Sequence, residues 1–166
     1  MLELDELTKH QQETLDKCTA AGHSHLHLKA PAGAGKTFVA MHHVLRVLEK
    51  RADARALFVA RNPALCYFIA RWITAREKNP LRQLQLLGRL HVLYEPFADG
   101  VRAVQLKGGR LSMEQTSHET EYALMVVDES HHIYKDSQKA LRDVVEHHVH
   151  KKKTQRLLIS DISQVT

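Results

Sequence analysis

Residues 30–37 read APAGAGKT and follow a short alternating run at 25–29 (HLHLK). Two glycines, a lysine and a hydroxyl residue at this spacing fit the phosphate-binding loop, with Ala30 at the position of the template's first glycine. Glycines let the backbone turn its N–H groups towards phosphate oxygens, and a helix beginning near Lys36 adds its positive end. The alternative, a plain glycine-containing turn, is disfavoured by the strand pattern before the loop and the helical pattern after it. This segment therefore predicts a strand–loop–helix unit that binds a nucleoside triphosphate.

Each residue of this loop has an expected role. Lys36 should reach the β- and γ-phosphates, and the Thr37 hydroxyl should ligate Mg²⁺. The expected nucleotide-binding residues of the loop are Ala30, Pro31, Ala32, Gly33, Ala34, Gly35, Lys36 and Thr37.

A second candidate site follows the apolar run at 124–127 (LMVV), where Asp128 and Glu129 stand together. An aspartate at the end of a buried strand suits Mg²⁺, usually through a water molecule. Glu129 is then placed to orient and deprotonate the attacking water. Together with the phosphate-binding loop, this pair predicts hydrolysis and disfavours a metabolite kinase, whose acceptor is a hydroxyl group.

The remaining apolar patterns alternate between helix and strand. Helices are predicted over 5–20, 36–49, 64–76 and 136–150, and strands over 25–29, 56–60, 91–94, 101–106, 122–127 and 156–160. Residues 81–87 are ambiguous, and the polar segment 113–121 is expected to be a loop.

This alternation predicts an α/β fold, a three-layer arrangement with a mostly parallel central sheet and helices on both faces. In such sheets ligands bind at the carboxyl ends of the strands, where both candidate sites fall. A length of 166 residues suits one domain.

Composition indicates an intracellular protein, cytoplasmic or nuclear. No apolar run approaches the roughly 20 residues that cross a bilayer, and the N-terminal segment lacks the pattern of a secretory signal. The two cysteines have no metal-ligand spacing. The net charge of +5 is compatible with a polyanionic partner and equally with an ordinary solvated surface.

Taken together, these segments resemble the first motor domain of superfamily 1 helicases, which has a RecA-like fold. Residues 7–13 (LTKHQQE) are similar to the family's adenine-reading glutamine motif, 30–37 to motif I, and 128–131 (DESH) to motif II. Residues 59–64 (VARNPA) stand where motif Ia contacts single-stranded nucleic acid, and 160–164 (SDISQ) resemble motif III.

The resemblance implies further roles. Gln11 would read the adenine edge, Gln164 would sense the γ-phosphate, and Asp161 would couple that sensing to nucleic acid. The expected cofactors are ATP and Mg²⁺, and the expected partner is single-stranded DNA or RNA.

Two departures from the motifs, at 130–131 and at Ser160, resemble the divergent Schlafen-related helicase-like group. Such helicases also have a second RecA-like domain. The resemblance therefore implies that residues 1–166 are one RecA-like ATP-binding domain of a larger protein.

Other patterns leave alternatives open. A signalling or regulatory P-loop ATPase of the STAND or AAA+ kind would explain the divergent motif III, although not the glutamine motif. Trp72 and Tyr67 are interpreted as core residues rather than base-stacking ones. The thirteen histidines are interpreted as surface or groove residues rather than zinc ligands.

Overall fold

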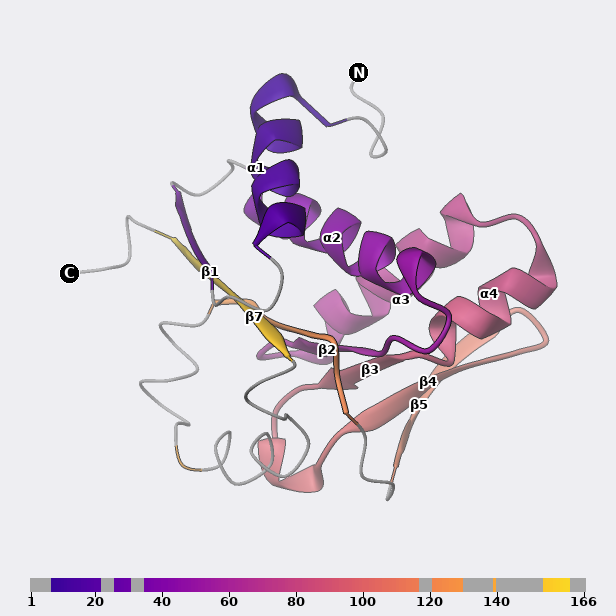
Figure 1. Ribbon diagram of the computed structural model, residues 1–166. Helices are drawn as coiled ribbons and strands as arrows, with labels where there is room; N and C mark the ends of the chain where they lie inside the picture. Colours follow the sequence, from indigo (N-terminus) through magenta and orange to yellow (C-terminus); the bar gives the residue numbers. More distant parts are fainter. Residues whose placement is uncertain are drawn as a thin grey trace.

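The computed structural model describes residues 7–21, 26–30, 35–116, 121–129, 139 and 154–161. Their elements follow one another along the chain (Figure 1) as α1 (Lys9–Ala20), β1 (Leu26–Ala30), α2 (Lys36–Lys50), β2 (Ala56–Val59), α3 (Pro63–Arg76), α4 (Pro80–Leu87), β3 (Leu90–Leu93), the 3₁₀ turn η1 (Phe97–Asp99), β4 (Arg102–Lys107), β5 (Arg110–Gln115), β6 (Leu124–Val127) and β7 (Gln155–Asp161).

The strands form one seven-stranded sheet in the order β1-β7-β6-β2-β3-β4-β5. The first five strands in this order are mutually parallel, whereas β4 and β5 are antiparallel to their neighbours. The carboxyl ends of β1, β7, β6, β2 and β3 therefore meet at one edge of the sheet. The predicted α/β class with a mostly parallel sheet is confirmed.

The described helices α1–α4 lie on the same side of the sheet (Figure 1). A large apolar cluster joins α2, α3 and α4 to the sheet face beneath them, through residues such as Val44, Ile69 and Val126. A smaller cluster on the opposite face contains Leu57 and Met125. The helix predicted over 136–150 lies outside the described residues, apart from Lys139.

Local sequence signals explain where the helices begin. Asn62 and Asn79 each accept a backbone hydrogen bond from the first turn of the helix that follows, and each precedes a proline. Asparagine is a favoured N-cap, and proline suits the first helical position because its missing N–H has no intrahelical partner. The ambiguous segment 81–87 is helical, as part of α4.

One element differs from the sequence prediction. The segment expected to be a loop from residue 113 begins within β5, which pairs with β4 along its whole length across the Gly108–Gly109 turn. The loop prediction was wrong there because cross-strand hydrogen bonds compensate for the weak apolar pattern of RLSMEQ. This hairpin extends the sheet beyond β3.

The interpretation of Trp72 as a core residue is confirmed, because its side chain is only 6% exposed. It meets the rings of Phe38 and His42 edge-on, and Arg76 lies over its face. Tyr67 is half-buried and packs against the same core. No helix of the described residues is long and apolar enough to cross a membrane.

Candidate nucleotide site

The sheet register brings the predicted motifs to the same edge. Ala30, where the phosphate-binding loop begins, is the strand partner of Asp161 at the end of β7. Val127, directly before the two acids, pairs with Val59 of β2 and Leu158 of β7. The end of β1, the acids after β6 and the segment after β2 are thus neighbours at the carboxyl edge.

Thr37 and Asp128 are in direct contact although they lie 91 residues apart in the chain. The Thr37 hydroxyl donates a hydrogen bond to Asp128 Oδ1 over 3.2 Å. Burial raises the pKa of the Asp128 carboxyl, and the charge of Glu129 raises it further. The hydrogen bond from Thr37 and the charge of Lys36 act in the opposite direction. The buried Cys66 lies close to the same carboxylate, and its pKa is raised to about 12, mainly by burial.

The donor set of this pair fits Mg²⁺. A hydroxyl and a carboxylate are the hard oxygen ligands that Mg²⁺ prefers, and Mg²⁺ usually takes few protein ligands and keeps its other positions for water and phosphate. A cation held there would also offset the electrostatic cost of a buried carboxylate next to Glu129.

Glu129 has a left-handed backbone, with φ of 49°. A non-glycine residue seldom adopts this conformation, and such strain clusters at functional sites. Its side chain is exposed, unlike the four buried residues of β6 before it. The turn therefore places an exposed acidic residue directly after Asp128, where its charge acts on the Asp128 carboxyl.

Gln11 is placed against the end of the phosphate-binding loop. Its Nε2 lies 2.1 Å from the position that a Cβ would occupy on Gly35, whose φ is 80°. Gln11 also forms a capping box with Thr8: the Thr8 N–H donates to Gln11 Oε1 over 3.0 Å, and the Gln11 N–H donates to Thr8 Oγ1 over 3.1 Å. Gly35 is thus required both by its left-handed backbone and by the closeness of the Gln11 amide.

A cavity of about 240 Å³ lies between α1, β1 and the beginning of α2. Its lining residues are His10, Gln11, Thr14, Lys17, His27, Leu28, Lys29, Lys36 and Val39. Gln11 and Lys36, the two predicted nucleotide-binding residues in this lining, place the cavity directly beside the loop.

Several predicted residues lie outside the described part of the chain. These are Pro31, Ala32, Gly33 and Ala34 of the loop, residues 130–131 after the acid pair, and Gln164. Lys36 begins α2, and Asp161 ends β7. The structure therefore brings together Gln11, Gly35, Lys36, Thr37, Asp128 and Glu129.

Backbone hydrogen bonds continue between the chain segments that follow β2, β3 and β6. The sequence patterns did not reveal this continued pairing. The Asp128 N–H donates to Val59 O, the Ala60 N–H to Leu93 O, and the Glu95 N–H to Arg61 O, over 2.9, 3.0 and 3.1 Å. We call these paired residues, 59–61, 93–95 and 128, the carboxyl shelf. Arg61 Nε lies 3.5 Å from Glu95 Oε1 on this shelf.

The family described as Type III restriction enzyme, res subunit, matches residues 4–159. Among curated proteins, no sequence matches this chain.

Among solved structures, the chain is similar to the crystal structure of the Pyrococcus furiosus Hef helicase domain, with 17% sequence identity and a TM-score of 0.52. The similarity covers 91% of this chain and 32% of that chain, so this chain spans about a third of its length. At this level of identity the likeness shows the fold.

Proposed function

Because the chain belongs to the family of the type III restriction enzyme res subunit, and is a helicase-like RecA-fold ATPase domain of superfamily 1 or 2, we propose that it binds ATP with Mg²⁺ and hydrolyses it in response to nucleic acid. The observation that carries this proposal is the Thr37–Asp128 contact with Glu129 adjacent to it. A hydroxyl and a carboxylate from distant segments meet where the phosphate-binding loop ends.

The residues would divide the chemistry among them. Thr37 and Asp128 would hold Mg²⁺, which when bound neutralises charge on the phosphate oxygens. Lys36, at the first position of α2, would contact the β- and γ-phosphates, where the helix's positive end also acts. The exposed Glu129 carboxylate would orient the attacking water and accept its proton.

Two further roles belong to the same proposal. Gln11 would contact the adenine edge through its side-chain amide, which can donate and accept at once. Gln164 would sense the γ-phosphate, and Asp161 would link that sensing to bound nucleic acid. The cavity beside Gln11 and Lys36 supports a base-binding position there.

The partners are single-stranded DNA or RNA and a second RecA-like domain. In the helicases that the motifs resemble, a second RecA-like domain completes the nucleotide site, so residues 1–166 assayed by themselves are expected to bind ATP–Mg²⁺ and turn it over slowly. A strong ATP-dependent strand separation by this chain alone would contradict that expectation.

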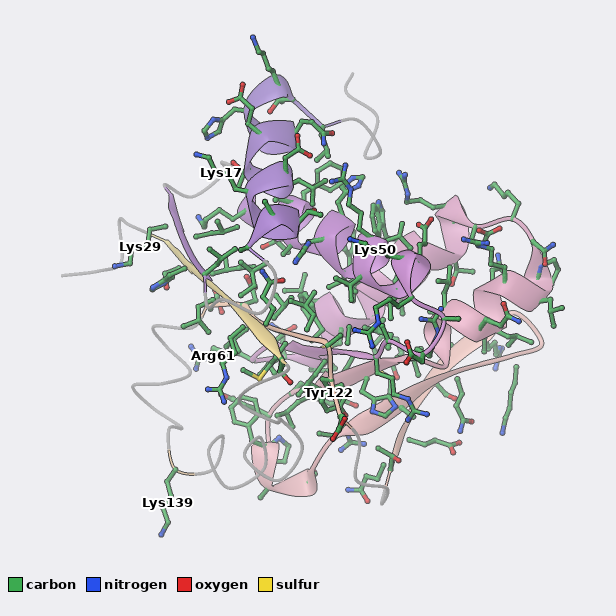
Figure 2. All side chains as sticks on the ribbon, in the orientation of Figure 1. Lys17, Lys29, Lys50, Arg61, Tyr122 and Lys139 are labelled. Carbon is green, nitrogen blue, oxygen red and sulfur yellow. The ribbon has the colours of Figure 1, made fainter. Side chains whose placement is uncertain are left out.

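Nucleotide binding and hydrolysis are tested separately. Lys36→Ala is expected to abolish ATP–Mg²⁺ binding measured by calorimetry, whereas Glu129→Gln should retain binding and lose hydrolysis. Lys50→Ala is the matched control, because Lys50 lies at the other end of α2 (Figure 2). Undiminished binding by the Lys36→Ala variant would overturn the proposed site.

The dependence on nucleic acid is tested by measuring ATP hydrolysis with and without single-stranded DNA and RNA. Stimulation by either polymer supports the proposal. Nucleotide-dependent oligomerisation without stimulation would instead support the signalling P-loop alternative.

A further inference from the structure

We propose that two carboxylates, Glu95 and Asp99, mask two arginines of a phosphate track for single-stranded nucleic acid, and that the bound strand displaces these carboxylates. This inference rests on the proposed function, because it assigns the polynucleotide contact of the same site. It identifies Arg61 and Arg102 as the phosphate-binding residues and the short segment between β3 and β4 as their competitor.

The first masked arginine is Arg61, which directly follows β2 and its partner Ala60 on the carboxyl shelf. Its Nε lies 3.5 Å from Glu95 Oε1, and the two side chains are 39% and 41% exposed. Both groups therefore remain in contact with solvent, and a ligand anion can approach the guanidinium. A guanidinium binds carboxylate and phosphate oxygens with the same planar array of N–H donors, so the two anions compete for it.

The second masked arginine is Arg102, at the beginning of β4. Its Nη2 lies 3.4 Å from Asp99 Oδ2. Its guanidinium carbon also lies 4.8 Å from the centre of the Tyr94 ring. The aromatic face holds the guanidinium in place when the carboxylate leaves, because the cation–π contact does not depend on Asp99.

The backbone fixes both masking acids in place. The Glu95 N–H donates to Arg61 O, so the masking acid and its arginine lie on paired backbone segments. The Asp99 N–H donates to Pro96 O, and the Gln115 amide donates to Asp99 O over 2.8 Å. The segment 95–99 thus presents two carboxylates to two arginines from one anchored turn.

The two ion pairs of the mask are expected to be weak, because the side chains of Arg61, Glu95 and Asp99 are 39%, 41% and 47% exposed and only Arg102, at 20%, is more buried. Ion pairs between solvent-exposed side chains contribute little, because water and salt screen them. A strand that replaces both carboxylates gains two phosphate contacts and releases counterions. Removing one carboxylate is therefore expected to raise affinity by about fivefold at most, at low salt.

The Arg61–Glu95 pair lies close to the nucleotide site along the backbone. Arg61 lies two residues after Val59, whose carbonyl accepts the Asp128 N–H. One backbone hydrogen bond thus joins the strand that carries Arg61 to the residue that precedes Glu129, so the phosphate track lies beside the nucleotide site.

The test measures binding of fluorescently labelled oligodeoxythymidylate and oligouridylate by anisotropy, across a range of salt concentrations. Glu95→Gln and Asp99→Asn keep the side-chain size and remove the charge. Both are expected to tighten binding by about three- to fivefold at low salt, with a smaller effect at high salt. Arg61→Gln should weaken binding and lower the salt slope by about 0.7.

The matched control is Asp53→Asn. Asp53 pairs with Arg51 over 3.4 Å in the turn before β2, at the opposite edge of the sheet. This variant loses the same kind of exposed ion pair, so unchanged affinity is expected. An equal gain in affinity in Asp53→Asn would show a general charge effect and overturn the proposed masking.

The remaining outcomes separate this inference from the proposed function. If the unaltered chain binds the oligonucleotides, and Glu95→Gln, Asp99→Asn and Arg61→Gln bind them with the same affinity, the inference alone is overturned. Absence of binding and of stimulated hydrolysis in both the unaltered chain and Glu95→Gln overturns the proposed response to nucleic acid, and the inference with it.

Discussion

At the residue scale, two glycines adopt nearly the same left-handed backbone in different surroundings. Gly35 has φ of 80° and faces the Gln11 amide, whereas Gly109 has φ of 76° and nothing within 4 Å of an added Cβ. Gly109→Ala is expected to lower the free energy of unfolding by about 1 kcal/mol through backbone strain alone. Gly35→Ala should cost about 1 kcal/mol more, because Gln11 must leave its capping box.

Urea unfolding of these two variants, alone and combined with Gln11→Ala, measures the difference. The additional cost of Gly35→Ala should disappear in the Gln11→Ala background. If it persists there, the closeness of Gln11 is not its cause.

Asp128 gives a second prediction at this scale. Burial raises its folded pKa above the ordinary value of 3.8. The folded state then binds the proton more tightly than the unfolded state, so stability falls as pH rises through this range and the loss remains at neutral pH. Asp128→Asn is therefore expected to raise the thermal midpoint of the ligand-free chain while removing its response to ATP–Mg²⁺.

Calorimetric scans of the unaltered chain and of Asp128→Asn at neutral pH, with and without ATP–Mg²⁺, measure both the thermal midpoint and its response to the nucleotide. A lower midpoint for the ligand-free Asp128→Asn chain would contradict the electrostatic account of this site.

Residue-scale features were only partly predictable from the sequence. Motif spacing predicted that Thr37 and Asp128 belong to one site, because the proposed chemistry restricts residue type, and the two side chains are in hydrogen-bond contact. The Thr8–Gln11 capping box has a recognisable pattern, Thr-x-x-Gln. It was missed because Gln11 was interpreted only as part of an adenine-reading motif. The Arg61–Glu95 pair could not be predicted, since it depends on two neighbouring strands whose order no local pattern specifies.

At the element scale, buried polar side chains join α1, α2 and β7. His43 Nε2 lies 2.6 Å from Gln155 Oε1, and Gln155 Nε2 donates to the Cys18 carbonyl over 3.0 Å. Arg46 of α2 also contacts Asp16 and Thr19 of α1. The position of α1, and with it Gln11, therefore depends on the beginning of β7.

This connection predicts a pH dependence. Burial lowers the folded pKa of His43 below 6.5, more than its hydrogen bond with Gln155 raises it. The unfolded state then binds the proton more readily, so stability is present above pH 6.5 and is lost as pH falls towards the folded pKa. His43→Gln is expected to flatten the decline of the thermal midpoint between neutral and mildly acidic pH.

Melting curves across this pH interval measure the effect, and His10→Gln on the exposed surface of α1 is the control. An unchanged acid decline in His43→Gln would assign the loss to other groups.

The elements themselves were largely predictable. Continuous apolar runs identified β2 and β6, because parallel strands in the middle of a sheet are buried on both faces. The hairpin strand β5 was missed, since an edge strand with few apolar residues takes its stability from pairing with β4. The helix start at Pro63 followed from local capping chemistry, which acts within a few residues, whereas α4 was left ambiguous although Asn79 and Pro80 repeat the same pattern.

At the scale of the whole molecule, the proposed nucleotide contacts come from segments far apart in the chain: Gln11 in α1, Lys36 and Thr37 in α2, and Asp128 after β6. A ligand that binds this folded arrangement alone stabilises the entire domain, by about 2.7 kcal/mol at a concentration of 100 times Kd. ATP–Mg²⁺ is therefore expected to raise the thermal midpoint of the unaltered chain and of Glu129→Gln, but not of Lys36→Ala.

Differential scanning fluorimetry at several nucleotide concentrations checks this linkage. A midpoint that responds equally in Lys36→Ala would mean that the stabilising ligand binds elsewhere. The narrower assignments, to superfamily 1 and to the Schlafen-related group, stay predictions.

The carboxyl shelf has a consequence for amide hydrogen exchange. Loop amides at a ligand-binding edge usually exchange rapidly, because local opening there requires little free energy. The amides of Ala60, Glu95 and Asp128 are instead bonded to carbonyls of neighbouring segments. They should exchange with the slow rates of the central strands, so that this edge opens only when the sheet itself opens.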